Sequence, residues 1–195
     1  MEDKRIQKTK KYLKKTLIEI LGFKPFEKIT VKEICEKSQI SRMTFYAHYN
    51  DKYDLVDDIS KDMIKIAQDD YRRLQKENNA EKNSITSYCN FLGCILNLYY
   101  KNLDFFSHVA ISESPYLNFS FNKYVMEYLK IHAQKRSRTL KPKYDIKKIA
   151  GFLCCGFLEF VNESNLEKCS PKTVIKEAVE ILRGILESEI LTNND

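Results

Sequence analysis

Glycine and proline are scarce in this chain, and this scarcity limits its fold more than any other feature of the sequence. Five glycines and four prolines stand among 195 residues, about 5% of the chain against a usual share of about 12%. A many-stranded sandwich or barrel needs turn-forming residues between its short strands. The sequence therefore predicts an all-α protein.

The sequence also argues against a membrane span or a secretory signal. The longest apolar stretches, such as residues 151–158, reach about half of the roughly 20 residues that a spanning helix needs, and Lys and Arg dominate the first fifteen positions. The six cysteines contain no C-x-x-C pair and lie mostly in apolar, helical-looking segments. We expect a cytoplasmic protein with reduced thiols and with no membrane contact, no metal and no cofactor.

The positive charge is concentrated at one end of the chain. Residues 1–50 contain 12 Lys and Arg against 6 Asp and Glu, whereas residues 51–195 contain 21 of each sign. The whole formal excess of +6 thus lies in the first quarter. A basic N-terminal segment joined to a neutral body predicts contact with a polyanion through that end.

The first fifty residues show the pattern of three helices. Apolar residues recur at helical spacing at Ile6, Leu13, Leu17, Ile20 and Leu21, and this helix ends near Gly22. Thr30 and Glu33 have the spacing of a capping box and start a short second helix, and Ser41 can cap a third helix that runs to Tyr49. Two short helices joined by a tight turn are typical of a helix-turn-helix DNA-binding domain.

The third helix has one face for packing and one face that stays free. Phe45 and Tyr49 lie four residues apart, so they share a face that can pack on Ile34 and Ile40. The opposite side then carries the remaining side chains, those of Met43, Thr44, Ala47 and His48. A free face on the second helix of such a motif is the part that enters the major groove.

The stretch from Thr30 to Leu55 resembles the signature of the TetR family of transcriptional regulators. Here T-V-K-E-I-C is followed by I-S-R-M-T-F-Y-A-H-Y-N-D-K and then by Leu55, where the family has T-V-x-x-I-A and V-S-x-x-T-F-Y-x-H-F-x-x-K-x-x-L. Cys35, Ser38 and Gln39 depart from the family pattern. Gln39 stands where the family has glycine, so we expect it to take a positive φ in a slightly strained turn.

This resemblance implies a two-domain organisation. Residues 1–50 are expected to form a three-helix, helix-turn-helix DNA-binding domain, and residues 51–195 a helical ligand-binding and dimerisation domain similar to the Firmicute-type C-terminal domain of some TetR-like regulators. Apolar periodicity in the second part predicts helices at about 51–76, 84–99, 103–110, 115–134, 145–163 and 171–191, with start signals at Ser84, Ser114, Asp145 and Ser170. The chain would then have about nine helices.

The resemblance also assigns roles to residues of the DNA-binding domain. Arg42, Met43 and Ala47 are expected to face base edges, where Arg42 can donate two hydrogen bonds to guanine. Contacts to phosphates are expected from the positions that match the family's backbone-binding residues: Thr30, Thr44, Tyr46, His48 and Lys52. The alternative is that Tyr46 and His48 are ordinary surface residues and that the lysines of the first helix only solvate it.

Aromatic residues in the body suggest a cavity for a small apolar or aromatic ligand. Of the 23 Phe and Tyr residues, 15 lie between Tyr88 and Phe160, and aromatic side chains often line ligand clefts between helices. With the family resemblance, the candidate pocket residues are Tyr88, Phe91, Tyr99, Phe105, Phe106, Tyr124, Tyr128 and Phe152. The alternative is that these residues simply fill the core.

Each of the last two long helices has an apolar surface that is too broad for one partner helix to cover. The resemblance places a homodimer interface there, as a four-helix bundle about a two-fold axis. Its candidate residues are Phe152, Gly156, Phe157, Phe160, Val174, Ala178, Ile181, Leu182 and Ile185. A two-fold dimer with two recognition helices predicts a near-palindromic operator on double-stranded DNA.

An enzyme is not expected, because the sequence contains no catalytic constellation. It has no H-E-x-x-H pattern, no phosphate-binding loop and no G-x-S-x-G motif. The adjacent Cys154 and Cys155 could act as a thiol sensor, but no nearby Lys or His clearly lowers their pKa. The sequence favours a ligand-responsive repressor that binds its operator as a homodimer. The alternatives are a transcriptional activator or co-activator of the same family and a helical protein-protein adaptor.

Overall fold

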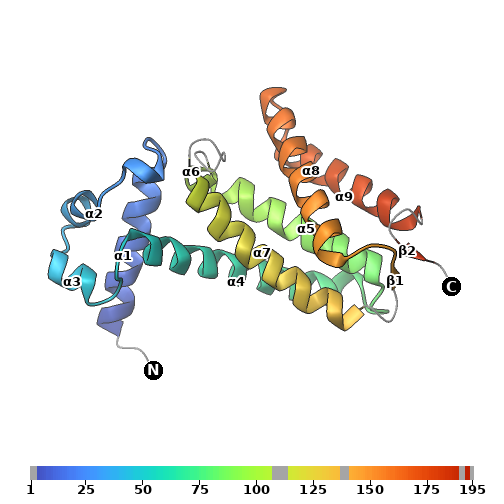
Figure 1. The fold of residues 1–195 in the computed structure, drawn as a ribbon, viewed down its shortest axis with the longest axis horizontal. Helices are drawn as coiled ribbons and strands as arrows, with labels where there is room; N and C mark the ends of the chain where they lie inside the picture. The colour runs from blue at the N-terminus through green and yellow to red at the C-terminus, as the bar shows by residue number, and fades with distance from the viewer. Residues whose placement is uncertain (1–3, 107–113, 137–140, 189–191, 194–195) are drawn as a thin grey trace. The chain divides into compact units, whose positions relative to one another are not determined.

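The computed structural model describes residues 4–106, 114–136, 141–188 and 192–193. Within these ranges the chain forms nine α-helices (Figure 1): α1 (Lys4–Leu21), α2 (Val31–Ser38), α3 (Arg42–Tyr46), α4 (Lys52–Asn78), α5 (Ser84–Lys101), α6 (Leu103–Phe106), α7 (Pro115–Arg136), α8 (Ile146–Leu166) and α9 (Pro171–Glu187). A 3₁₀ turn, η1 (Phe26–Lys28), precedes α2, and two short strands, β1 (Lys141–Pro142) and β2 (Thr192–Asn193), pair antiparallel. The predicted all-α fold class is confirmed.

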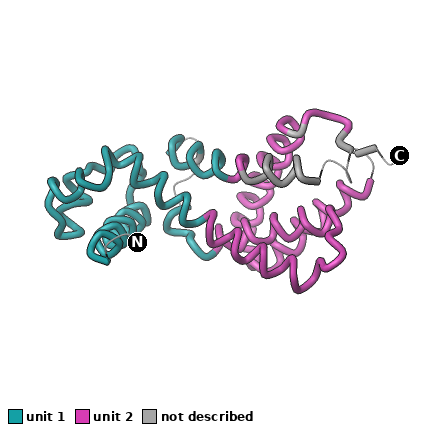
Figure 2. The backbone as a smooth tube through the Cα atoms, turned by 90° about the horizontal axis from the view of Figure 1, so that it is seen from below, with its two compact units in different colours: residues 1–63, 101–124 teal, residues 64–100, 125–195 magenta. Residues whose placement is uncertain are grey.

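The helices belong to two compact units (Figure 2). Unit 1 consists of Met1–Met63 and Lys101–Tyr124, and unit 2 consists of Ile64–Tyr100 and Val125–Asp195. This division differs from the predicted boundary after residue 50, because α6 and the first part of α7 group with the N-terminal helices. The assignment of DNA binding to residues 1–50, and of ligand binding and dimerisation to residues 51–195, concerns function and stays a prediction.

Unit 1 is built on the apolar face of α1, which packs against α2 and α6. Leu13, Leu17, Ile20 and Leu21 are buried as the spacing predicted, whereas Ile6 near the start of the helix is only partly buried. Each such burial stabilises the fold by about 1.5–3 kcal/mol. Unit 1 also buries almost completely the large side chains of Phe26, Ile29, Ile34, Phe45, Leu55, Val56, Phe105 and Leu117. The predicted helix-turn-helix thus rests on a core to which residues beyond position 100 contribute.

Four predicted helix starts are confirmed by their capping hydrogen bonds. At α2 the Thr30 side chain accepts from the Glu33 amide and the Glu33 carboxylate accepts from the Thr30 amide, which completes the capping box. The side chains of Ser41, Asp145 and Ser170 accept from backbone amides at the starts of α3, α8 and α9. These caps form between residues two or three apart, so the sequence pattern alone reveals them.

Unit 2 has a core made by α5, α8 and α9. Leu96, Val161, Val174 and Ala178 are its buried members. The start of α5 corrects a prediction, because Ser84 is the first residue of the helix and the Asn83 Oδ1 accepts from the amide three residues later, at 2.9 Å. The cap is therefore one residue earlier than expected.

Candidate nucleic-acid interface

Two aromatic side chains fix the second helix of the helix-turn-helix. Phe45 is 0% exposed and Tyr49 is 5% exposed, and their ring centroids lie 5.8 Å apart. The face of α3 that was predicted to pack is thus buried. α3 is shorter than expected and ends at Tyr46. The Tyr49 amide nevertheless donates to the Phe45 carbonyl at 3.0 Å, so helical hydrogen bonding reaches the predicted end.

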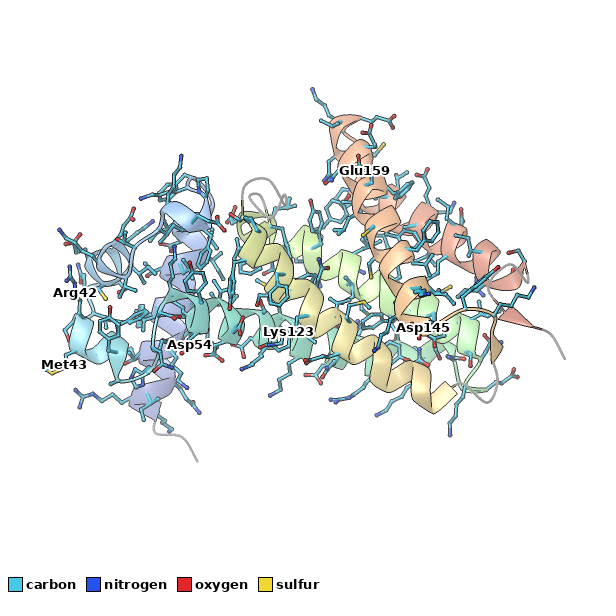
Figure 3. All side chains as sticks on the ribbon, viewed as in Figure 1. Arg42, Met43, Asp54, Lys123, Asp145 and Glu159 are labelled. Carbon is cyan, nitrogen blue, oxygen red and sulfur yellow. The ribbon has the colours of Figure 1, made fainter. Side chains whose placement is uncertain are left out.

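The opposite side of α3 is open to solvent. Met43 is 83% exposed and Tyr46 is 56% exposed, and Arg42 and Ala47 are also exposed. Figure 3 shows the Arg42 and Met43 side chains projecting outward from the helix. Arg42 forms no ion pair with any described residue. A free guanidinium beside a thioether and a methyl group can contact guanine and thymine edges in a major groove.

Thr30, Thr44 and His48, which are predicted to contact phosphates, are all at least partly exposed. Thr30 is exposed at the start of α2, and Thr44 and His48 are partly buried on α3 and just after it. The Thr44 hydroxyl lies 2.9 Å from the Ser41 hydroxyl, which holds its rotamer. The place of these residues is compatible with backbone contacts, and their role stays a prediction.

Lys52 is engaged within the protein, which argues against its predicted phosphate contact. Its ammonium donates to the carbonyl oxygens of Phe26 at 2.8 Å, Glu27 at 3.1 Å and Ile29 at 2.9 Å. An ammonium has three N–H donors, and here all three have acceptors. Burial lowers the pKa of Lys52, against the effect of Glu27 and in the same direction as that of Lys24. Lys52 therefore holds the η1 turn that leads into α2.

Asp58 on α4 connects the helix-turn-helix to α1. Its carboxylate lies 2.9 Å from the Lys14 ammonium and accepts from the Tyr49 hydroxyl at 2.7 Å. Lys14 also contacts Asp62, one turn later, at 2.6 Å. Burial alone would raise the pKa of Asp58, but the hydrogen bonds from Lys14 and Tyr49 outweigh it and lower that pKa. α1, α4 and the end of the recognition segment are thereby joined by one carboxylate.

The first turns of α7 make contacts with the N-terminal helices that the sequence did not indicate. The Phe26 amide donates to the Ser114 hydroxyl at 3.2 Å, and the Phe26 and Tyr116 rings stack with centroids 5.8 Å apart. The Tyr116 and Ser120 hydroxyls both donate to Asp57, at 3.1 and 2.6 Å. Burial, followed by the charge of Asp57, raises the pKa of Tyr116. These partners are about 60–90 residues apart, so no local pattern signals them.

The turn between α2 and α3 has the strained conformation that the sequence predicted. Gln39 has φ 56° and ψ 33°, in the left-handed region. Its backbone N–H donates to the Glu36 backbone carbonyl at 3.3 Å. The left-handed conformation costs an L-residue with a Cβ about 1–2 kcal/mol, and glycine adopts it freely. The predicted positive φ is confirmed.

We predict that Gln39→Gly raises the free energy of unfolding by up to about 1 kcal/mol, because relief of this strain exceeds the added flexibility of the unfolded chain. Gln39→Val should lower it by about 1–2 kcal/mol, since a β-branched residue tolerates positive φ poorly. Glu36→Gly, inside α2, is the control and should lose about 1 kcal/mol. Urea unfolding followed by circular dichroism measures all three. A loss of stability in Gln39→Gly would contradict the prediction.

The predicted ligand-pocket residues are divided between the two units. Phe105, Phe106 and Tyr124 belong to unit 1 and Tyr88, Phe91 and Tyr99 to unit 2; of these, only the three phenylalanines are buried. The side chain of Tyr128 lies outside the described residues. Phe152 is 73% exposed, so it does not line an enclosed cavity of a single chain. A hollow of about 410 Å³ has other walls, formed by Gln75, Lys76, Asn79, Ala80 and Lys82.

The predicted dimer residues have three different environments. Val174, Ala178 and Leu182 are buried in the chain itself, so they offer no surface to a second copy and their assignment to the interface is wrong. Phe157, Phe160 and Ile185 are partly buried, and Phe152, Gly156 and Ile181 are exposed. The helix periodicity identified the apolar faces, but it could not show which residues of α9 are buried in the core of unit 2.

Neither a reactive thiolate at Cys154 nor a metal-binding cluster is indicated among the described residues. Burial, with the neighbouring Cys155 adding to it, raises the pKa of Cys154 to about 11, which disfavours the reactive thiolate. Within the residues that the structure describes, no group of three or more His, Cys, Asp and Glu side chains is placed to hold a metal ion. In the same part of the chain, no helix combines the length and apolar character of a membrane span.

Comparison with solved structures identifies the fold. A protein of Syntrophomonas wolfei described as a TetR-family transcriptional regulator has a TM-score of 0.73 at 12% identity, over 93% of this chain and 96% of that chain. A TetR transcriptional regulator of Streptococcus agalactiae has a TM-score of 0.61 at 21% identity, over 93% and 97%. The fatty acid degradation regulator FadR of Bacillus halodurans has a TM-score of 0.66 at 12% identity, over 90% and 94%.

Sequence comparison gives a shorter match. The helix-turn-helix-type transcriptional regulator YxbF of Bacillus subtilis is 37% identical over 51 residues, which cover 26% of this chain and 13% of that protein. No protein-family model matches the chain. The similar structures are described as regulators, and their likeness establishes that the chain has the TetR fold.

Proposed function

We propose that this chain, which has the fold of the TetR-family regulators, is a cytoplasmic, DNA-binding transcriptional regulator that reads double-stranded DNA with the exposed face of α3. The observation that carries this proposal is the two-sided recognition helix. Phe45 anchors one side in the core, and Arg42 and Met43 extend from the other. Such an arrangement presents a rigid reading surface to a major groove.

The charge distribution supports the same proposal. The formal excess of +6 lies entirely within residues 1–50, the segment that carries the helix-turn-helix. Neutralisation of phosphates by Lys and Arg supplies most non-specific DNA affinity. The exposed Arg42, Met43 and Ala47 then supply sequence preference, and Thr30, Thr44, Tyr46 and His48 hold the backbone.

The proposed regulator acts as a homodimeric repressor on a near-palindromic operator. Phe152, Gly156 and Ile181, which are exposed on α8 and α9, are the interface residues that remain available, with Phe157, Phe160 and Ile185 partly so. A small apolar ligand bound within residues 51–195 would favour a position of α4 that moves the two heads apart. A head is here the helix-turn-helix of one protomer. α4 suits this role because it runs from unit 1 into unit 2 and holds α1 through Asp58.

A salt titration of DNA binding tests the proposal. DNA fragments from the source genome are selected on the purified chain, and the affinity for the enriched fragment is measured at several salt concentrations. We expect log affinity to fall linearly with log salt, by about 0.9 for each phosphate contacted. If the chain binds no duplex even at low salt, the DNA-binding proposal fails and a protein-protein adaptor takes its place.

Arg42→Ala should relax sequence preference at one base pair of each half-site. The change removes a bidentate guanine contact, so we expect the discrimination at that position to fall by about 1–3 kcal/mol, while binding to random DNA changes little. A panel of operator variants with single base changes measures the loss. Tyr46→Ala is the comparison, since loss of a backbone contact should weaken binding to all sequences alike. Unchanged preference in Arg42→Ala would show that another residue reads the operator.

A further inference from the structure

The first half of α1 carries an unbalanced positive charge. Between Lys4 and Lys15 the sequence has seven Lys and Arg and no Asp or Glu, and the first acid of the helix is Glu19. Glu2 and Asp3, which precede the helix, lie outside the described residues. The positive charge therefore lies on a continuous helical segment that contains no acidic residue to neutralise it.

Three of these lysines form one exposed row. Lys4, Lys8 and Lys11 are spaced by four and three residues, so they share a face of the helix, and all three are exposed. None of them forms an ion pair with a described carboxylate. The other lysines of this segment differ, because Lys14 contacts Asp58 at 2.9 Å and Lys15 lies 3.6 Å from a Glu19 oxygen.

This row is unfavourable for the helix that carries it. Like charges three and four residues apart repel one another, and positive charges in the first turns also oppose the helix dipole. Several exposed basic residues on other helices have carboxylate partners instead, as in the pairs Arg73–Glu77 on α4 and Lys176–Glu180 on α9. Solubility alone does not require an uncompensated row, but a polyanion bound along it would remove the repulsion.

We propose that Lys4, Lys8 and Lys11, defined here as the α1 lysine row, form a second DNA-binding surface that holds phosphates outside the bases that α3 contacts. This inference rests on the proposed DNA-binding function. The row spans about 10 Å of helix axis at about 1.5 Å per residue, the axial length of about three base pairs. In Figure 1 the first turns of α1 and the short helix α3 both lie toward the lower end of the N-terminal helices.

The structure favours a nucleic acid over an anionic membrane as the partner of this row. A basic amphipathic helix binds a membrane by inserting its apolar face between lipids. In α1 that face is occupied, since Leu13 and Leu17 are 0% exposed and Ile20 is 1% exposed. The lysines remain available without the apolar anchor that a membrane-binding helix needs, which leaves a phosphate backbone as the matching surface.

The test compares the intact chain with the triple variant Lys4→Gln, Lys8→Gln, Lys11→Gln on one selected DNA fragment between 50 and 200 mM salt. Each lost phosphate contact should reduce the slope of log affinity against log salt by about 0.9, so about 2.7 for each bound head. Over this fourfold range the intact chain should lose about 40-fold more affinity per head than the variant. The preference among operator variants should not change, and the melting temperature should stay equal or rise.

The control is the triple variant Lys65→Gln, Lys76→Gln, Lys172→Gln, which removes the same charge from other exposed positions and should keep the original slope. If the α1 variant binds the fragment with an unchanged slope, the inference is overturned and the DNA-binding proposal stands. If the intact chain binds no fragment, the DNA-binding proposal itself fails. Loss of binding to phosphatidylserine vesicles with unchanged DNA binding would assign the row to a membrane and also overturn the inference.

Discussion

Replacing Phe45 with alanine is expected to lower the free energy of unfolding of the DNA-binding segment by about 3–5 kcal/mol. Phe45 is fully buried, and its ring packs against those of Tyr46 and Tyr49, with centroids 5.4 and 5.8 Å away. Truncation removes the side chain that fixes α3 and leaves a cavity. Urea unfolding and hydrogen exchange of residues 30–50 measure the loss, and DNA binding should disappear with it.

Met43→Ala is the matched control for this change. Met43 lies two residues away on the same helix but is 83% exposed, so its truncation should change stability by no more than about 0.5 kcal/mol. The fold should persist while preference for a thymine at one operator position declines. Equal stability losses in the two variants would mean that α3 is not anchored through Phe45.

Replacing Lys52 with methionine should destabilise the same segment by about 2–4 kcal/mol, because three carbonyl oxygens lose a charged donor and the cation over an aromatic ring is removed. Lys52 Nζ lies 4.4 Å from the centroid of the Phe26 ring and donates to the carbonyls of η1. For protein kept folded at low temperature, the salt dependence of DNA binding should stay as in the intact chain.

The salt slope separates this structural role from the phosphate contact that the family resemblance implies. A lysine on a phosphate would leave stability nearly unchanged when replaced and would reduce the slope by about 0.9 per head. Lys65→Met, at an exposed position of the same helix, provides the baseline for removing one charge from α4. A reduced slope together with normal stability in Lys52→Met would contradict the structural role.

Much of the fold follows from patterns between residues that are close in sequence. The scarcity of turn-forming residues predicted an all-helical chain, and the side chains of Thr30, Ser41, Asp145 and Ser170 cap the helices where they were expected. The positive φ of Gln39 was predicted as well. Caps, turns and helix faces depend on partners two to four residues away, so a sequence shows both members at once.

The candidate site could be predicted only in part. Helix spacing identified the buried Phe45 and the exposed Met43, because a helix places residues four apart on one face, and the family resemblance pointed to Arg42. The family resemblance assigned Lys52 to a phosphate contact, whereas its ammonium donates hydrogen bonds to three carbonyl oxygens of the chain itself. It also assigned Ala178 to a dimer surface, although α5 and α8 cover that residue in the chain itself.

The amino-acid sequence by itself determined the helical class, the capped starts of α2, α3, α8 and α9, and the two-sided recognition helix. Only the tertiary structure decided which acceptors surround the Lys52 ammonium, which partners share Asp57 and Asp58, and which apolar residues of α8 and α9 remain exposed. The physical reason is that hydrogen bonding and burial depend on groups brought together from positions 9–63 residues apart. That proximity is created by the packing of whole helices, and the local spacing of residues in the sequence does not reveal it.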